Sequence, residues 1–451
     1  MENELKKKYG LPTAIAMVVG IVIGSGVFFK AETVLKATGG NMSLGIAAWL
    51  IVGLIMIICS YTFATMATKY QKINGVVDYA EMGVGKTYGY LVGWFMATIY
   101  TPSITSVLAW VSARYTCVLL GWDITGGSCM TIACFYLILS YAINTLSPIL
   151  AGKLQVTTTV IKLIPLVIMA VVGTIIGLVN GMMVENFTNV VQVGSGTGGG
   201  LFSSIVAVAF AYEGWIIATS INSELRDSKK TLPLALILGS LIVVATYIAY
   251  YIGLAGAVPT AILMESGEAG AKLAFQKLFG SLGGSLIFVF VIISCLGTLN
   301  GLMMGCTRSF YSLAYRNTGP ATKTFKQVDP VSNMPGNSAI MGLLVTSILL
   351  LYFYGANLTD PWFGPFSFDT SELPIVTLYG MYIPIFFMIM KKQKDWGIFN
   401  RFIMPFLSLL SCVFMVVAAY LAHGKDVFFY LIVFIVVMLV GVIFYRKNSL
   451  A

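Results

Sequence analysis

Long apolar stretches recur along almost the whole chain, and short polar loops separate them. Each stretch approaches the roughly 20 residues that an α-helix needs to cross a bilayer. Only 10% of the 451 residues are charged, whereas a soluble domain carries about 25%. The sequence lacks the alternating strands, each of roughly ten residues, of a membrane β-barrel. Only helices and closed barrels satisfy their backbone polar groups in lipid, so the sequence predicts an all-α polytopic membrane protein.

Twelve spanning helices account for these stretches. We expect them at residues 12–29, 43–68, 87–118, 127–146, 156–180, 201–220, 232–258, 281–313, 338–354, 372–390, 401–421 and 425–445. Because this number is even, both ends of the chain are expected on the same side of the membrane.

The basic residues indicate which side that is. With a cytoplasmic N-terminus, twenty of the 27 Lys and Arg residues are cytoplasmic, and Lys162 falls within a span. The other six fall outside, at Lys30, Lys36, Arg114, Lys272, Lys277 and Lys425. Because basic residues favour cytoplasmic loops, we expect a multi-pass protein of the plasma membrane with both termini cytoplasmic. The net charge of +9 reflects those loops, and no nucleic acid partner is expected.

Residues that catalyse reactions or bind metals are scarce. His423 is the only histidine, which excludes the HExxH motif of metalloproteases and any site built from several histidines. The seven cysteines include no CxxC pair. The sequence therefore predicts no enzymatic activity, no metal and no cofactor. His423 lies at the outer end of the eleventh span, where we expect an interfacial loop residue.

Two of the spans are interrupted near their middle. The first contains Gly24, Ser25 and Gly26, and paired glycines destabilise a helix and permit close backbone approach. The sixth contains Glu213 and Gly214, and an ionisable residue within a membrane indicates a functional site. The interruptions are five spans apart, so the second half of the chain would be inverted relative to the first. Such a pair is typical of a transporter binding site.

The broken helix ends suit an amino acid. At residues 24–26 a half-helix would begin with free N–H groups and a positive dipole end, which favour a carboxylate. Near residues 210–212 a half-helix would end with free carbonyl groups, which favour an ammonium group. Together they predict a site for the zwitterionic part of an α-amino acid. The alternative is that Gly20 and Gly24 form only a helix-packing face.

Lys162 and Glu213 are ionisable residues within spans. Lys162 lies six residues into the fifth span, about 9 Å deep at 1.5 Å per residue. It either extends to the cytoplasmic interface, replaces a bound cation with its ammonium group, or exchanges a proton. Glu213 is either a second proton site or a structural carboxylate that accepts hydrogen bonds from unwound backbone.

The eighth span carries small and polar residues on one face. Gly297, Gly301 and Gly305 are four residues apart, which lets another helix approach closely. Ser294 and Thr298 add hydroxyl groups nearby. We interpret this face mainly as a packing surface.

These motifs are similar to those of a known group of carriers. The chain resembles the amino acid–polyamine–organocation superfamily, and within it the L-type amino acid transporters, at residues 24–28, 210–215, 223–233 and 295–301. The resemblance implies a leucine-transporter-like fold with 12 transmembrane helices, in which two inverted five-helix repeats precede two further helices. The corresponding segments would be residues 1–190, 191–395 and 396–451.

The resemblance also implies a substrate site around the first break. It suggests substrate contacts at Ile23, Gly24, Ser25 and Gly26, with Ser25 and Gly26 binding the carboxylate. Phe210 would be an aromatic gate above the substrate.

Further substrate contacts are implied in the third and sixth spans. Ala211 and Glu213 would flank the carbonyl groups that bind the amino group. Ile99 and Tyr100 would line the side-chain pocket.

The resemblance implies that transport does not need sodium. Lys162, with Ser294 and Thr298 beside it, would occupy the place of a sodium ion in related carriers. We therefore predict an exchanger of small or medium neutral L-amino acids that works by alternating access. The alternative is a proton-coupled amino acid or amine symporter. A channel fits poorly because its pore motif would repeat symmetrically, and a membrane enzyme lacks its catalytic groups.

The sequence departs from the resemblance in two loops. Residues 73–79 lack the usual proline and glycine pair, which alters the local loop geometry. Residues 119–126 lack the cysteine through which eukaryotic members join a heavy subunit, although Cys117 and Cys129 flank the loop. We expect a stand-alone bacterial carrier without a heavy subunit, whose partners are amino acid substrates and the lipid bilayer.

Overall fold

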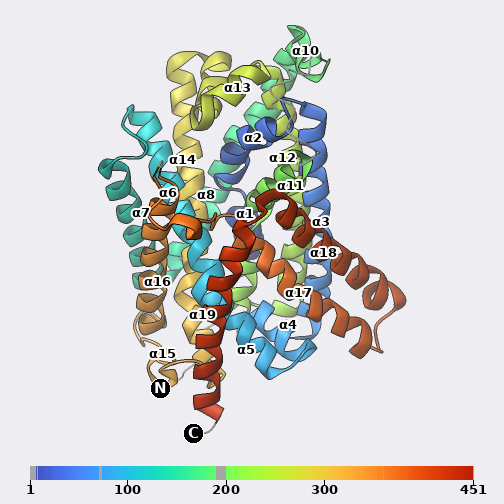
Figure 1. Cartoon of the computed structure of the whole chain (residues 1–451), viewed down its shortest axis with the longest axis vertical. Helices are drawn as coiled ribbons and strands as arrows, with labels where there is room; N and C mark the ends of the chain where they lie inside the picture. The colour runs from blue at the N-terminus through green and yellow to red at the C-terminus, as the bar shows by residue number, and fades with distance from the viewer. Residues whose placement is uncertain (1–6, 8, 71–73, 189–199, 359, 450–451) are drawn as a thin grey trace.

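The chain folds as a bundle of helices (Figure 1). The computed structural model describes residues 7, 9–70, 74–188, 200–358 and 360–449. Within that part of the chain, twelve helices are long and apolar enough to cross a membrane, which confirms the predicted number. Apart from an isolated bridge between Tyr9 and Leu225, these residues form no β-structure. The chain is an all-α polytopic membrane protein with the leucine-transporter-like fold.

The helices before residue 189 form the first five spans and their connections. They are α1 (Leu11–Val22), α2 (Gly26–Ala37), α3 (Met42–Lys69), α4 (Gly75–Gly83), α5 (Lys86–Phe95), the π-helical turn η1 (Met96–Tyr100), α6 (Thr101–Leu120), α7 (Gly127–Leu146), α8 (Pro148–Ile168), the π-helical turn η2 (Met169–Gly173), α9 (Thr174–Val179) and α10 (Met182–Thr188).

The helices from residue 200 onward form the other seven spans. They are α11 (Gly200–Tyr212), the 3₁₀ segment η3 (Trp215–Glu224), α12 (Ser228–Ala257), α13 (Thr260–Ser266), η4 (Gly267–Ala269), α14 (Gly270–Tyr315), α15 (Thr322–Phe325), α16 (Gly336–Ala356), η5 (Gly364–Phe366), α17 (Leu373–Lys392), the π-helical turn η6 (Phe399–Ile403), α18 (Met404–His423) and α19 (Asp426–Ser449). The predicted boundary between residues 190 and 191 lies outside the described residues.

The first and sixth spans occupy the interior of the bundle. In their most apolar windows, 78% and 83% of the residues are buried, compared with 11% in α19. Figure 1 shows α19 at the front of the bundle, with α1 and α11 behind it. Lipid tails are as apolar as leucine, so an outer helix such as α19 can expose apolar side chains. The interrupted helices are instead enclosed by protein.

The interruption predicted in the first span is confirmed. α1 ends at Val22, Ile23 has extended backbone angles, and a new helix begins at Gly26. Ser25 occupies the N-cap position of that second helix. The break thus falls at the Gly-Ser-Gly sequence, where helix propensity is weakest.

The interruption predicted in the sixth span is also confirmed. α11 ends at Tyr212, and Gly214 adopts a φ of +98° before η3 begins at Trp215. This left-handed conformation is strained for any residue with a Cβ atom. Glycine at this position lets the chain turn directly after Glu213.

Candidate functional site

Lys162 is fully buried beside the first break. Its Nζ donates hydrogen bonds to the Gly20 carbonyl at 2.5 Å and to Thr298 Oγ1 at 3.1 Å. Gly20 is in the last turn of α1, whose carbonyl groups have no partners within the helix. The ammonium group therefore contacts oxygen atoms like those that bind a metal cation, and the side chain does not extend to the interface. Within the described residues, no group of His, Cys, Asp or Glu is arranged to hold a metal ion.

Two hydroxyl groups of α14 lie close to further carbonyl groups of this break. Thr298 Oγ1 lies 3.0 Å from the Ile23 carbonyl, and Ser294 Oγ lies 3.4 Å from the Gly24 carbonyl. A buried carbonyl without a partner would destabilise the protein by about 1–3 kcal/mol. The structure thus brings Ser294 and Thr298 together with Lys162 around the first break.

The start of α2 has the opposite polarity. The first N–H groups of an α-helix lack partners within the helix, and its dipole makes this end positive. Ser25 forms no capping hydrogen bond. Its hydroxyl is fully buried and has no partner among the described residues. Because an unpaired buried hydroxyl is unfavourable, this helix end is suited to a ligand such as a carboxylate.

The end of α11 lies directly against the start of α2. A Cβ atom on Gly26 would collide with the backbone of Ala211, so only glycine allows this approach. The Tyr247 hydroxyl lies 2.7 Å from the Val22 carbonyl and 3.0 Å from the Ala211 carbonyl, and so connects the two breaks. The end of α11 carries the negative end of its helix dipole. Two helix ends of opposite polarity therefore meet at this point.

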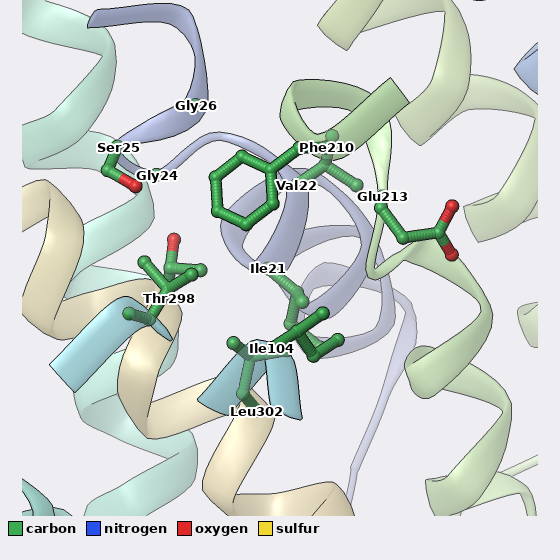
Figure 2. A pocket seen from close by; sticks show the side chains of 11 residues that line it. Ile21, Val22, Gly24, Ser25, Gly26, Ile104, Phe210, Glu213, Thr298 and Leu302 are labelled. Atoms are coloured by element: carbon green, nitrogen blue, oxygen red, sulfur yellow. The ribbon is translucent and has the colours of Figure 1, made fainter. Parts of the chain in front are cut away.

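A small cavity lies between the two breaks (Figure 2). Its volume is about 20 Å³, which is room for about one water molecule. Figure 2 shows the Ser25 hydroxyl and the Phe210 ring facing the same space. The residues that line the cavity are Ile21, Val22, Gly24, Ser25, Gly26, Ile104, Leu108, Phe210, Glu213, Thr298 and Leu302. A ligand as large as an amino acid would fit here only after lining side chains such as Phe210 had moved.

Glu213 borders the cavity but directs its carboxyl group elsewhere. Figure 2 shows this group pointing away from Ser25 and Phe210. Its Oε1 accepts a hydrogen bond from the Tyr100 hydroxyl, and its Oε2 has no partner among the described residues. Tyr100 ends the π-helical turn η1, and such turns are frequent at functional sites. A proton or a cation would stabilise a carboxyl group buried in this way.

The structure separates the predicted residues into three groups. Those that line the cavity are Gly24, Ser25, Gly26, Phe210, Glu213 and Thr298. A second group lies beside the cavity and forms hydrogen bonds around the two breaks through backbone carbonyls or polar side chains. Its members are Ile23, Ala211, Lys162, Ser294 and Tyr100. Ile99 is buried in η1 and does not line the cavity.

The aliphatic wall of the cavity has no distinctive sequence signal. It consists of Ile21, Val22, Ile104, Leu108 and Leu302, none of which the sequence singled out. The spacing of four residues between Ile104 and Leu108 places them on one face of α6. That spacing does not show which face of α6 points inward, because the packing of the whole bundle decides it.

A buried ion pair joins two spans toward the chain termini. Arg308 Nε lies 2.6 Å from Glu224 Oε1, and Arg308 Nη2 lies 3.3 Å from Glu224 Oε2. The backbone of Tyr9 donates to the Glu224 carbonyl at 3.0 Å and accepts from Arg226 N–H at 2.8 Å. These contacts hold the N-terminal segment, η3 and α14 together on this side of the cavity.

Known proteins share this arrangement of sequence motifs. The family model described as amino acid permease matches residues 9–443. The chain belongs to the amino acid permease family. This permease is 31% identical to the serine/threonine exchanger SteT of Bacillus subtilis (strain 168), over 87% of this chain and 85% of that protein.

Two human transporters are more distant relatives. The b(0,+)-type amino acid transporter 1 is 24% identical, over 98% of this chain and 88% of its own. The cystine/glutamate transporter is 23% identical, over 68% of this chain and 61% of its own. The permease is therefore an amino acid transporter of the amino acid–polyamine–organocation superfamily, not an enzyme.

Proposed function

We propose that this permease is a sodium-independent exchanger of small and medium neutral L-amino acids that works by alternating access. The observation that carries the proposal is the cavity between two helix ends of opposite polarity, with the unpaired Ser25 hydroxyl in its wall. The substrate carboxylate would bind Ser25 and Gly26 at the start of α2, and its ammonium group would bind at the end of α11.

Lys162 supports sodium independence. Its ammonium group is hydrogen-bonded to the Gly20 carbonyl and to Thr298. A sodium ion bound there would have to displace a covalently attached positive charge. A fixed cation at this position stabilises the break throughout the transport cycle without an ion gradient.

The wall of the cavity supports a neutral side chain of limited size. Ile104, Leu108 and Leu302 present aliphatic groups, and a charged side chain placed against them would lose its hydration without gaining a partner. Alanine, serine, cysteine and threonine have small side chains, so they require the least movement of the residues around this cavity. The serine/threonine exchanger among the relatives agrees with this range.

The charge distribution supports an orientation in the plasma membrane with both termini cytoplasmic. In that orientation, Arg308 and Glu224 close the cytoplasmic side of the cavity. We further propose that residues 1–190 and 191–395 form the two inverted repeats, that residues 396–451 add two helices, and that the carrier works without a heavy subunit.

Glu213 favours a second candidate, a proton-coupled amino acid or amine symporter. The carboxyl group is buried, and its Oε2 has no partner among the described residues. A proton taken up by this group would move with the substrate if the group were exposed on each side in turn. An amine substrate could use the same carboxylate as its counter-charge.

Uptake of labelled serine and alanine into proteoliposomes separates the two candidates. Vesicles would be loaded with unlabelled serine or left empty, each with and without an inward proton gradient and with and without sodium. We expect uptake only into loaded vesicles and no effect of either ion. Proton-driven uptake into empty vesicles would refute obligate exchange and favour the symporter. A matched Glu213→Gln variant then tests whether that carboxyl group carries the proton.

A further inference from the structure

A cluster of charged residues lies on the other side of the cavity, away from Arg308 and Glu224. Lys30 Nζ lies 2.6 Å from Glu372 Oε1, and His423 Nε2 lies 2.9 Å from Glu372 Oε2. Lys30 is in α2, Glu372 directly precedes α17, and His423 ends α18. His423 is therefore part of a partly buried cluster, whereas the sequence predicted an interfacial loop residue.

This cluster contacts the residue that covers the cavity. Lys30 Nζ lies 5.3 Å from the centroid of the Phe210 ring, within the range of a cation–π interaction. Only 4% of the Lys30 surface and 7% of the Glu372 surface are exposed, so solvent does not screen the pair strongly. The position of Phe210 is thus linked to an ion pair between α2 and the start of α17.

We propose that Lys30, Glu372 and His423 form an ionic latch that positions Phe210 over the substrate cavity. The latch must separate before an amino acid can enter from this side, which is the outer side in the predicted orientation. Lys30 is a positioning residue, because it acts through Phe210. The role of the latch in transport rests on the proposed function. Its effect on access to the cavity does not, and can be measured without transport.

The charges around His423 indicate how pH acts on the latch. Glu372 and Lys30 lie in the cluster, and Asp369, in the segment before α17, interacts electrostatically with both Lys30 and His423. Two carboxylates then face a single ammonium group, and a proton on His423 balances them. Separation of the latch would expose His423 to water, where histidine has an ordinary pKa of about 6.5. Because Glu372 Oε2 lies 2.9 Å from His423 Nε2 in the closed latch, its negative charge favours the protonated ring there, so the latch is stabilised at low pH and weakened as pH rises.

The test measures access to the cavity with a cysteine. Ile104→Cys places a thiol in the cavity wall, and Cys134→Ser removes the native cysteine that is exposed. A membrane-impermeant thiol reagent added outside cells labels position 104 only when the outer side opens. The same background without Ile104→Cys is the control. The readout needs no transport, so it stays valid if no amino acid is exchanged.

Variants that neutralise the latch and variants that keep its charges have opposite expected effects on the labelling rate. We expect Lys30→Met or Glu372→Gln to raise the labelling rate by about fivefold or more. Lys30→Arg should stay near the parent, and the exchange of charges in Lys30→Glu with Glu372→Lys should restore slow labelling. Equal labelling in all these proteins would overturn the latch. If one neutral variant does not fold, the other still decides the question, because each of them alone removes one charge of the Lys30–Glu372 pair.

External pH supplies the second readout. In the parent, labelling should accelerate as pH rises above about 6.5, where the open state has already lost its proton, and this acceleration should vanish in His423→Asn. An acceleration of equal size without His423 would overturn its assigned role. If the cluster only supported the fold, the labelling rate would not depend on pH through His423.

Discussion

The two interrupted spans are held in different ways. At the first break, Lys162, Thr298 and Ser294 approach the carbonyl groups of residues 20, 23 and 24 from neighbouring helices. Tyr247 also approaches the carbonyl group of residue 22. At the second break, the Tyr247 hydroxyl approaches the Ala211 carbonyl at 3.0 Å.

This difference assigns different roles to the two breaks. A break fixed by four polar side chains provides a stable platform for the substrate carboxylate. A break with fewer attachments can change its backbone angles more easily, and it carries both Phe210 and Glu213. We infer that the first break binds, whereas the second break gates. The predictions below weaken first the binding break and then the cavity wall, and each leaves the second break intact.

Removal of the Lys162 side chain should have the largest effect. Lys162→Ala leaves the Gly20 carbonyl without its closest donor and removes the fixed positive charge. We expect exchange to fall about a hundredfold, as the loss of a buried charged hydrogen bond predicts. Serine exchange into loaded proteoliposomes measures this effect. Lys153→Ala, an exposed lysine of the same helix α8, is the matched control and should keep the parent rate.

Loss of the Ser25 hydroxyl should have an intermediate effect. Ser25→Ala removes a group that we expect to bind the substrate carboxylate, so the dissociation constant for serine should rise about tenfold. Calorimetric titration of the purified permease measures it. Ser112→Ala removes a buried hydroxyl that donates a hydrogen bond to the Leu108 carbonyl of its own helix, and it should leave affinity unchanged. An unaltered affinity in Ser25→Ala would instead mean that the Gly-Ser-Gly sequence serves only helix packing.

Enlargement of the cavity should have the smallest effect on the rate of serine exchange. Leu108→Ala removes an aliphatic group from the cavity but touches neither break. Serine exchange should change less than about threefold, while valine or leucine should gain about tenfold, as methylene discrimination in apolar pockets predicts. Competition between labelled serine and each larger amino acid reports the shift. Leu119→Ala, farther along α6, should not alter the preference. If this variant also exchanged valine or leucine faster, the cavity wall would not be what limits substrate size.

Local sequence was sufficient to locate both breaks. Glycines around Ser25 weaken a helix wherever they occur, and Glu213 beside Gly214 is conspicuous in an apolar span. These signals depend on a few adjacent residues, so they are readable without the fold. The same holds for the twelve spans, which hydropathy alone predicts.

The cavity wall and the charged cluster could not be found in this way. Leu108 and Leu302 differ from the many other leucines only in the direction they face, which packing decides. Lys30 is far from Glu372 and His423 in the sequence, and each of the three is unremarkable in its own segment. Only the fold brings their charges together above Phe210.

The most direct test of the central claim is the affinity of the purified permease for serine, measured with sodium chloride and with choline chloride. If Lys162 takes the place of a bound cation, the dissociation constant should be the same in both salts. A dissociation constant that falls substantially when sodium replaces choline would contradict the claim, because the site would then need an ion that Lys162 is proposed to replace.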